Sequence, residues 1–249
     1  MTRLSGKTAV VTGGGGGLGS AIAIALAAEG AHVLVVDRYG DAAERAARNI
    51  LAAGGSAAFE ALDIGDRAAV MAFGARVVEK YGTLDVLVNN AGISPRIRPE
   101  DPDQAERWDE TININLTGQW DVTVSVLPAL RHPGASVIFL SSIAAFKTPR
   151  ASAAYGAAKA GVRSLVQYFA NILGPTGGRA NGLAPGRIKS GLMTITGEGN
   201  AKYLERVPLG RVGETNEIAG PAVFLASDMS SYVTGITIPV DGGYLYASE

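Results

Sequence analysis

The chain of 249 residues contains no cysteine and only two histidines. Without cysteine it cannot form a disulfide bond or a cysteine-ligated zinc site. His32 lies at the start of a predicted strand and His132 in a proline–glycine turn, so neither is placed as a general base or as part of a metal cluster. A G-x-S-x-G nucleophile elbow is also missing. These absences argue against a serine hydrolase and a zinc enzyme, and we expect no metal.

Charge of one sign and long hydrophobic runs are equally scarce. The chain has 22 Lys and Arg against 23 Asp and Glu, a net charge of −1, which argues against a nucleic-acid surface or a polybasic membrane anchor. No apolar stretch reaches membrane-spanning length, and the N-terminus MTRLSGKTAV enters a predicted strand without the apolar core of a signal peptide. We therefore expect a cytoplasmic protein whose partner is a small molecule.

Short apolar segments alternate with helical patterns along the whole chain. We predict buried strands at 7–12, 31–37, 84–89, 136–140 and 235–240, and helices at 18–28, 41–53, 66–81, 111–130, 152–173 and 214–227. This alternation indicates an α/β fold, a doubly wound parallel sheet with helices on both faces. No linker, repeat or charge block divides the chain, so we predict a single domain over 1–249. In such folds, ligands bind at the carboxyl ends of the strands.

Five consecutive glycines at 13–17 stand between the first predicted strand and the first predicted helix. Each glycine costs roughly 0.5–1 kcal/mol against alanine in regular structure, so the run needs a physical reason. A strand, a tight turn and a helix N-terminus together present unpaired N–H groups that bind an anion such as a pyrophosphate. Two spacings match: G-x-G-x-x-G at Gly14, Gly16 and Gly19, and T-G-x-x-x-G-x-G at Gly13, Gly17 and Gly19. The run alone does not choose between them.

Two carboxylates follow predicted strands. Asp37 closes the second strand about 20 residues beyond the glycine turn, where it can bind an adenosine ribose or cap the turn before Gly40. Asp63 follows a further apparent strand, the third along the chain, between the predicted helices at 41–53 and 66–81, where it can meet an adenine ring or cap the next helix. Both alternatives stay open for each residue.

A tyrosine and a lysine, Tyr155 and Lys159, are four residues apart in a predicted helix and share one face. Of the eight tyrosines, Tyr155 alone has lysine at that offset. A nearby ammonium favours the phenolate, so the pair can move a proton between an alcohol and a carbonyl; the spacing also fits an exposed, uncoupled pair. Just upstream, Ser141 and Ser142 end a strand, where a hydroxyl can donate to a substrate oxygen or form a turn.

With these residues identified, the sequence resembles the short-chain dehydrogenase/reductase family, in particular its small nicotinamide-dependent members. TGGGGGLG resembles the family's T-G-x-x-x-G-x-G cofactor loop, which favours Gly13, Gly17 and Gly19 and leaves 14–16 as variable positions. NNAG at 89–92, NLTG at 115–118, APGRIKSG and ITIPVDGG resemble further family motifs. Ser142 stands thirteen residues before Tyr155, as the family's catalytic serine does. The resemblance runs from about residue 4 to 243.

The resemblance implies a Rossmann-like domain that transfers a hydride between NAD and a secondary alcohol or ketone, with a substrate loop at about 187–212. It implies the catalytic residues Asn115, Ser142, Tyr155 and Lys159. The implied cofactor-binding residues are Gly13, Gly17, Leu18, Gly19, Asp37, Arg38, Asp63, Ile64, Asn90, Ala91, Gly92, Tyr155, Lys159, Pro185, Gly186, Ile188 and Ser190. Tyr155 would exchange the substrate proton, and Lys159 would lower its pKa and hold the nicotinamide ribose. Ser142 would polarise the substrate oxygen, and Asn115 would order a relay water.

The family comparison also predicts what the chain is not. Y-x-x-x-K spacing argues against enoyl reductases of related fold, which space these residues more widely. A catalytically idle nucleotide sensor or scaffold is the alternative, and the intact catalytic set argues against it. The chain departs from the family at Ser190, where threonine is commoner, and at Gly178 and Ala180, where larger residues are usual. A homotetramer is implied, with helices near 111–130 and 152–173 in subunit contacts.

Charges near the predicted site suggest two preferences. Asp37 favours NAD, because its carboxylate repels the 2′-phosphate of NADP, with Arg38 as a counterweight. Two basic loops, with Arg96 and Arg98 in one and Arg187 and Lys189 in the other, suggest an anionic substrate. The alternative is that these cations point to solvent or pair with acidic neighbours, which are Glu100, Asp101 and Glu198.

Overall fold

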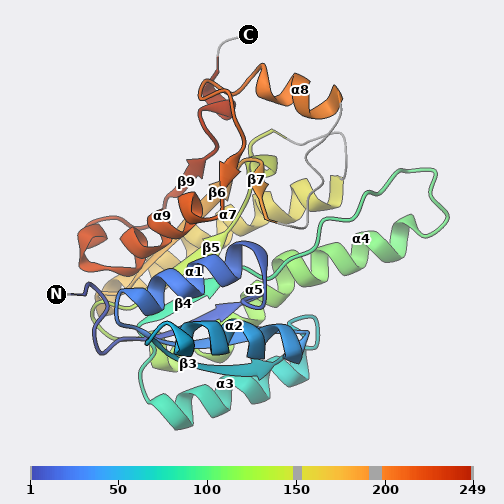
Figure 1. Cartoon of the computed structure of the whole chain (residues 1–249). Coiled ribbons are helices and arrows are strands. Elements are labelled where there is room, and N and C mark those ends of the chain that lie inside the picture. Colours follow the sequence, from blue (N-terminus) through green and yellow to red (C-terminus); the bar gives the residue numbers. More distant parts are fainter. Residues whose placement is uncertain (1, 148–152, 191–197, 248–249) are drawn as a thin grey trace.

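A seven-stranded parallel sheet forms the centre of the computed structural model, which describes residues 2–147, 153–190 and 198–247 (Figure 1). Its strands are β1 (Thr8–Thr12), β2 (His32–Asp37), β3 (Ser56–Ala61), β4 (Val86–Asn89), β5 (Ser136–Leu140), β6 (Arg179–Pro185) and β9 (Thr237–Val240). Their order is β3-β2-β1-β4-β5-β6-β9, so the chain reverses its direction across the sheet between β1 and β4. This reversal is the point at which doubly wound folds bind ligands. The short strands β7 (Ile188–Lys189) and β8 (Gly213–Glu214) pair separately.

Helices cover both faces of the sheet. They are α1 (Gly17–Ala28), α2 (Gly40–Ala52), α3 (Arg67–Tyr81), α4 (Gln104–Ile112), α5 (Gly118–Ser125), α6 (Leu127–Leu130), α7 (Ala153–Leu173), α8 (Glu198–Leu204) and α9 (Asn216–Ala226). Residues of α1, α2 and α9 pack in one core, and those of α3, α5 and α7 pack in the other. The segment between β4 and α4 projects from this body (Figure 1). None of the helices in the described ranges has the length and apolarity to cross a lipid bilayer.

Alternation along the strands explains the two cores. Successive side chains of a strand point to opposite faces, so Val11 joins the core under α1, α2 and α9, whereas Val10 joins the core under α3, α5 and α7. Val137 and Ile138 divide in the same way on β5. A sheet buried on both faces needs nearly continuous apolar strands, and this is the pattern from which the strands were predicted.

The predicted elements agree with the structure except at their ends and in one helix. The helix expected at 111–130 is not continuous: α4 ends at Ile112, a π-helix (Asn113–Thr117) follows, and α5 ends at Ser125. Pro128, in the first turn of α6, has no N–H to continue the α5 hydrogen bonds. The strand expected at 235–240 begins at Thr237, after Gly235 with its positive φ of 79°. Position 152, the expected start of the long helix, lies outside the described residues.

Candidate active site

The glycine turn joins β1 to α1 at the carboxyl edge of the sheet. Gly13 and Gly17 have φ values of +63° and +54°, in the left-handed region that favours glycine. A Cβ on Gly13 would lie 2.8 Å from the Cα of Ala91, and one on Gly19 would overlap the carbonyl oxygen of Gly13. The close approach therefore supports T-G-x-x-x-G-x-G as the spacing that the backbone requires.

Two of the three intervening glycines are also constrained, although the family pattern makes them variable positions. A Cβ on Gly14 would lie 2.8 Å from Val35 Cγ1, and one on Gly15 would lie 2.7 Å from Ala42 Cβ. A Cβ on Gly16 meets nothing within 4 Å. The long glycine run thus lets the turn pack against β2 and α2 and leaves an open backbone at Gly16. Such a cradle fits a nucleotide pyrophosphate.

Asp37, at the end of β2, is held against the glycine turn. Its Oδ2 accepts a hydrogen bond from the Gly15 N–H at 3.0 Å, and its Oδ1 accepts one from the Tyr39 N–H at 3.0 Å. The carboxylate is half-buried. Asp37 is therefore fixed beside the loop, with lone pairs left for a ribose hydroxyl.

Asp63 is not the cap of the following helix. Its Oδ1 accepts a hydrogen bond from the Gly65 N–H at 2.8 Å, whereas Asp66 caps α3 by accepting from the Ala69 N–H at 3.0 Å. The helix-cap alternative is thus wrong for Asp63, because Asp66 stands at the N-cap position. The adenine role of Asp63 stays a prediction.

The NNAG segment is tied to the glycine turn. Asn90 Nδ2 donates to the carbonyl oxygens of Thr12 and Gly13, both at 3.0 Å. In return, Thr12 Oγ1 accepts from the backbone N–H groups of Asn90 and Ala91 at 3.1 and 3.2 Å. The two loops on either side of the β1–β4 reversal are therefore locked together. Sequence reasoning missed the role of the Thr12 hydroxyl, for which the threonine of T-G-x-x-x-G-x-G was the signal.

Asn115 lies in the π-helix and is fully buried. Its Oδ1 accepts from the Ile93 N–H at 2.9 Å, and its Nδ2 donates to the Ile93 carbonyl at 2.7 Å. A Cβ on Gly92 would lie 2.5 Å from that Oδ1, so only glycine leaves room for the amide. π-Helical turns recur at functional sites because they redirect a side chain within a helix.

The two serines after β5 have different roles. Ser141 Oγ donates to the backbone carbonyl of Lys159 at 2.9 Å and is buried, so it joins the strand end to α7. Ser142 Oγ accepts from the Ala144 N–H at 3.1 Å and is hydrogen-bonded with the Tyr155 side chain. Geometry therefore favours Ser142 as the serine that faces the tyrosine, as the resemblance implied.

Lys159 is buried, with 3% of its surface exposed. Its Nζ donates to the Leu140 carbonyl at 2.7 Å and lies 5.7 Å from the centre of the Tyr155 ring. Burial lowers the pKa of Lys159 from 10.5 to about 8, because the charged form loses its hydration. The hydroxyl of Tyr155 has a raised pKa, again through burial, and the hydrogen bond with Ser142 opposes part of that rise. The expected lowering of the Tyr155 pKa by Lys159 is therefore not seen here, where burial dominates.

The other predicted cofactor residues surround the same edge of the sheet, and their roles stay predictions. They are Leu18, Arg38, Ile64, Pro185, Gly186, Ile188 and Ser190. Gly186 donates its N–H to the Val240 carbonyl at 3.0 Å, and a Cβ on it would lie 2.8 Å from the Tyr203 hydroxyl. Of the predicted substrate loop, 191–197 lie outside the described residues. Among the described residues, no group of three or more His, Cys, Asp or Glu side chains is arranged to hold a metal.

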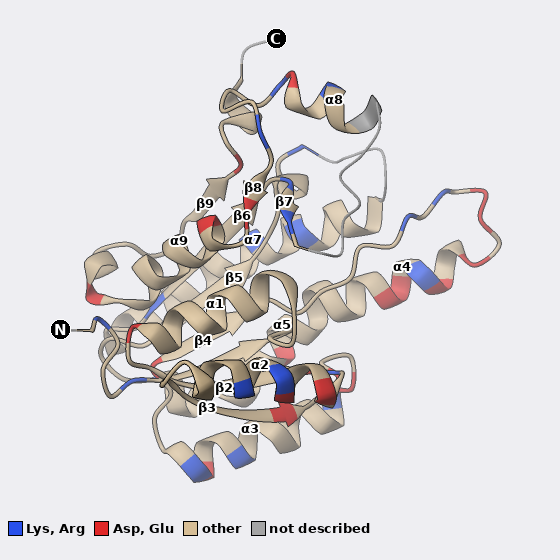
Figure 2. Cartoon of the chain, viewed as in Figure 1, with Lys and Arg blue, Asp and Glu red and all other residues tan. Residues whose placement is uncertain are grey.

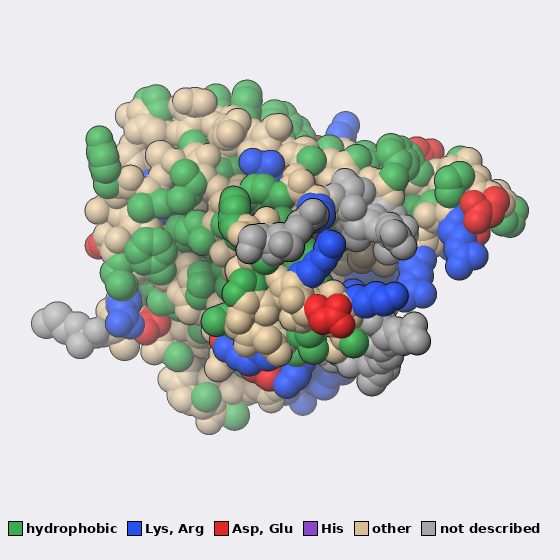
Figure 3. Space-filling model, turned by 90° about the horizontal axis from the view of Figure 1, so that it is seen from above, with side chains coloured by type: hydrophobic (Ala, Val, Ile, Leu, Met, Phe, Trp, Pro, Cys, Tyr) green, Lys and Arg blue, Asp and Glu red, His purple; other side chains and the backbone are tan. Residues whose placement is uncertain are grey.

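The four cations of the basic loops differ in their surroundings. Lys189 forms an exposed ion pair with Glu214 at 2.5 Å. The Arg187 guanidinium lies 4.4 Å above the Tyr203 ring. Arg96 and Arg98 are exposed on the projecting segment. Figure 3, which views the molecule from above Figure 1, shows Lys and Arg side chains gathered around a hollow. Lys189 is thus already paired, and Arg187 is held by Asn200 and Tyr203 of α8, which lies within the predicted substrate loop.

Comparisons with known proteins match nearly the whole chain. A family model described as "Enoyl-(Acyl carrier protein) reductase" matches residues 13–245. The chain is 39% identical to trans-4-hydroxycyclohexanecarboxylate dehydrogenase of Sinomonas cyclohexanicum, covering 97% of this chain and 93% of that protein. It is 39% identical to L-rhamnose 1-dehydrogenase (NAD(P)(+)) of Azotobacter vinelandii, covering 95% and 96%. A structure described as a putative NAD(P)-dependent gluconate 5-dehydrogenase from Beutenbergia cavernae, with bound NADP, superimposes with a TM-score of 0.93 at 36% identity, covering 99% of each chain.

Proposed function

Because the chain belongs to the short-chain dehydrogenase/reductase family, we propose that it transfers a hydride between a nicotinamide cofactor and a secondary alcohol or ketone. One observation supports this function: each of the four predicted catalytic side chains lies next to another one of them. A Cβ on Gly92 would lie 2.5 Å from Asn115 Oδ1 and 3.5 Å from Lys159 Nζ. The lysine lies near the ring of Tyr155, whose hydroxyl is hydrogen-bonded with Ser142.

The described residues fit a dinucleotide. The glycine turn leads into the N-terminus of α1, whose first N–H groups have no partner within the helix, and Asp37 beside it offers carboxylate oxygens to a ribose. When bound, the nicotinamide supplies the hydride acceptor or donor. The chain's own task is then to position the substrate oxygen and to move one proton.

Tyr155 performs the proton transfer. Its raised pKa keeps the phenol protonated at neutral pH, so the tyrosine is prepared to donate a proton to a carbonyl. In the direction of alcohol oxidation, the tyrosine must first lose that proton, so oxidation should accelerate as the pH rises. Ser142 donates a hydrogen bond to the same substrate oxygen, and Lys159 supplies positive charge beside the ring.

Replacing Tyr155 by phenylalanine tests this function. The variant Tyr155→Phe removes the proton carrier but keeps the ring, so kcat should fall by about 10²–10⁴-fold while binding of NADH is nearly unchanged. Tyr232→Phe, at a fully exposed position, is the control and should keep full activity. The rates are followed by nicotinamide absorbance with a panel of alcohols and ketones. A Tyr155→Phe enzyme with more than a tenth of the wild-type kcat would contradict the assignment.

We also propose that NAD is preferred over NADP. Asp37 accepts hydrogen bonds from a ribose diol, and its negative charge opposes a 2′-phosphate. The ratio of kcat/KM for the two cofactors measures this preference. A relative named for both NAD and NADP supports only the broader statement that a nicotinamide cofactor is used.

The substrate is proposed to carry a carboxylate. Two of the compared proteins are named for hydroxy acids, hydroxycyclohexanecarboxylate and gluconate. In this chain, Arg187 lies just beyond β6, with its guanidinium over the Tyr203 ring and donating to Asn200 Oδ1 at 3.3 Å, and a substrate carboxylate would replace that neutral acceptor. Lys189 takes no part in this proposal because Glu214 already pairs with it.

We propose a homotetramer in the cytoplasm. Trp108 of α4 and Tyr168 of α7 are 40% and 49% exposed, and Trp120 of α5 lies 5.5 Å from Tyr168 between ring centres. Large aromatic side chains at a surface are typical of protein interfaces. Light scattering at micromolar concentration measures the mass, and a monomer there would contradict the proposal.

A further inference from the structure

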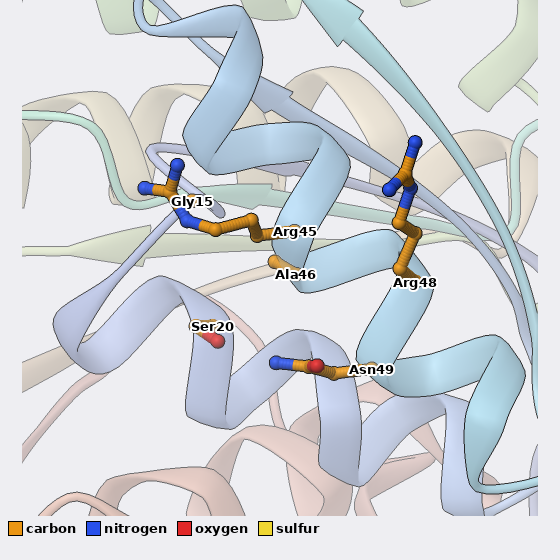
Figure 4. A pocket seen from close by; sticks show the side chains of 6 residues that line it. All are labelled: Gly15, Ser20, Arg45, Ala46, Arg48 and Asn49. Carbon is orange, nitrogen blue, oxygen red and sulfur yellow. The ribbon is translucent and has the colours of Figure 1, made fainter.

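An open pocket of about 270 Å³ lies beside the glycine turn, between α1 and α2 (Figure 4). Its lining consists of Gly15, Ser20, Arg45, Ala46, Arg48 and Asn49. Of these six described residues, two carry positive charge, two carry neutral polar side chains and none is acidic. The pocket is therefore suited to an anion.

The position of the pocket relates it to the cofactor site. Gly15 lines the pocket, and its N–H donates to Asp37 Oδ2 at 3.0 Å. On the proposed function, on which this inference rests, Asp37 receives the adenosine ribose. A group attached to the 2′ oxygen would then lie near Gly15, at the mouth of the pocket. A Cβ on Gly16 meets nothing within 4 Å, so an oxyanion can approach the backbone there.

The arginines near this mouth are not equivalent. Figure 4 shows the Arg45 side chain extending toward Gly15, whereas Arg48 points away from it. Arg48 is paired with Glu44 at 2.6 Å, and Arg38 stacks on the Tyr39 ring at 4.9 Å. Within the described ranges, no ion pair or hydrogen bond engages the Arg45 side chain. Helix α2 carries both positive and negative side chains along its surface (Figure 2). Arg45 is the basic residue of this helix that extends toward the glycine turn at Gly15.

We propose that Arg45 binds the 2′-phosphate of NADP and thereby determines how far this protein accepts the second cofactor. The guanidinium fork matches a phosphate with two parallel hydrogen bonds. Asp37 and Arg45 then act in opposition on the 2′ position: the carboxylate favours the hydroxyl of NAD, and the guanidinium offsets the repulsion of the phosphate of NADP. This assigns to α2 the role that the sequence had suggested for Arg38.

Calorimetric titration of adenosine 2′,5′-bisphosphate and of 5′-AMP tests the proposal without turnover. The two probes differ by the 2′-phosphate alone. Arg45→Gln should weaken binding of the bisphosphate by about 10-fold or more, and binding of 5′-AMP by less than about 2-fold, because it removes a charged hydrogen-bond pair that the bisphosphate alone makes. Arg76→Gln removes the same charge from α3, at a residue that does not line the pocket, and should change neither. Asp37→Asn should strengthen binding of the bisphosphate.

Three outcomes overturn the proposal. Equal weakening of both probes by Arg45→Gln would mean that Arg45 supports the fold of the site. If Arg45→Gln did not weaken binding of the bisphosphate, the 2′-phosphate would lie away from Arg45. If only Arg38→Gln weakened it, the 2′-phosphate would lie at Arg38, just after β2. Thermal unfolding of each variant separates loss of binding from loss of structure. A wild-type protein that binds neither probe nor NADH would instead refute the proposed function itself.

Discussion

Replacing Lys159 by methionine should stabilise the unliganded protein while it abolishes the activity. The pKa of the buried ammonium is lowered from 10.5 to about 8, which corresponds to roughly 3 kcal/mol of cost for holding the charge at pH 7. Methionine is similar in length and uncharged, so it removes this cost. The hydrogen bond from the charged Nζ to Leu140 is lost, which costs about 2 kcal/mol. We expect a net gain of about 1 kcal/mol.

The gain should depend on pH with a definite sign. Because the folded-state pKa of Lys159 lies below its unfolded value, the unfolded chain binds the extra proton between pH 8 and 10.5. Wild-type stability therefore rises through this window, whereas the variant lacks that rise. Below pH 8, both states of the wild type are protonated and the full cost is present. The advantage of Lys159→Met should thus be constant below pH 8 and shrink as the pH rises above it.

Thermal unfolding at fixed protein concentration, from pH 7 to 10, measures this difference. A gain of about 1 kcal/mol raises the Tm of a domain of this size by roughly 2–4 °C. Lys80→Met, at an exposed position on α3, is the matched control and should leave the Tm nearly unchanged. A Tm for Lys159→Met at or below that of the wild type at pH 7, or a difference that does not change with pH, would refute the reasoning.

Two further predictions concern the cofactor loop and the substrate. Gly19→Ala should abolish NADH binding because the new Cβ overlaps the Gly13 carbonyl oxygen, whereas Gly16→Ala should retain NADH binding. Fluorescence titration with NADH measures both affinities, and equal affinities of the two variants would contradict the close packing at Gly19. Arg187→Ala should raise the KM for a carboxylate substrate several-fold more than for its neutral ester, and added salt should shrink the difference. Lys189→Ala should affect neither substrate, and equal changes for both substrates in Arg187→Ala would exclude a role in recognition.

The strands were predictable because apolar runs buried on both faces are a local signal. The glycine run alone left two spacings open, and the family resemblance chose the one that the close approach of Gly13 and Gly19 to their neighbours supports. The π-helix was not predictable, since its side chains have the same periodicity as those of an α-helix to within one residue. Two further features were not predictable because they depend on segments far apart in the sequence. They are the ion pair of Lys189 with Glu214 and the burial that raises the pKa of Tyr155.

The π-helix also restricts where the chain tolerates insertions and deletions. A π-turn contains one residue more than an α-turn, so deleting one residue from Asn113–Thr117 would let the segment relax into a regular α-helix. Because a π-turn accommodates its extra residue within one turn, that relaxation would leave α5 close to its present orientation relative to α4, and the packing of α4 on α7 and of α5 on α3 would be kept. Asn115, however, would lose the widened turn that holds its amide against Ile93. The segment that presents Asn115 therefore has an obligatory length, and we expect length changes among functional variants to fall in the projecting loop before α4.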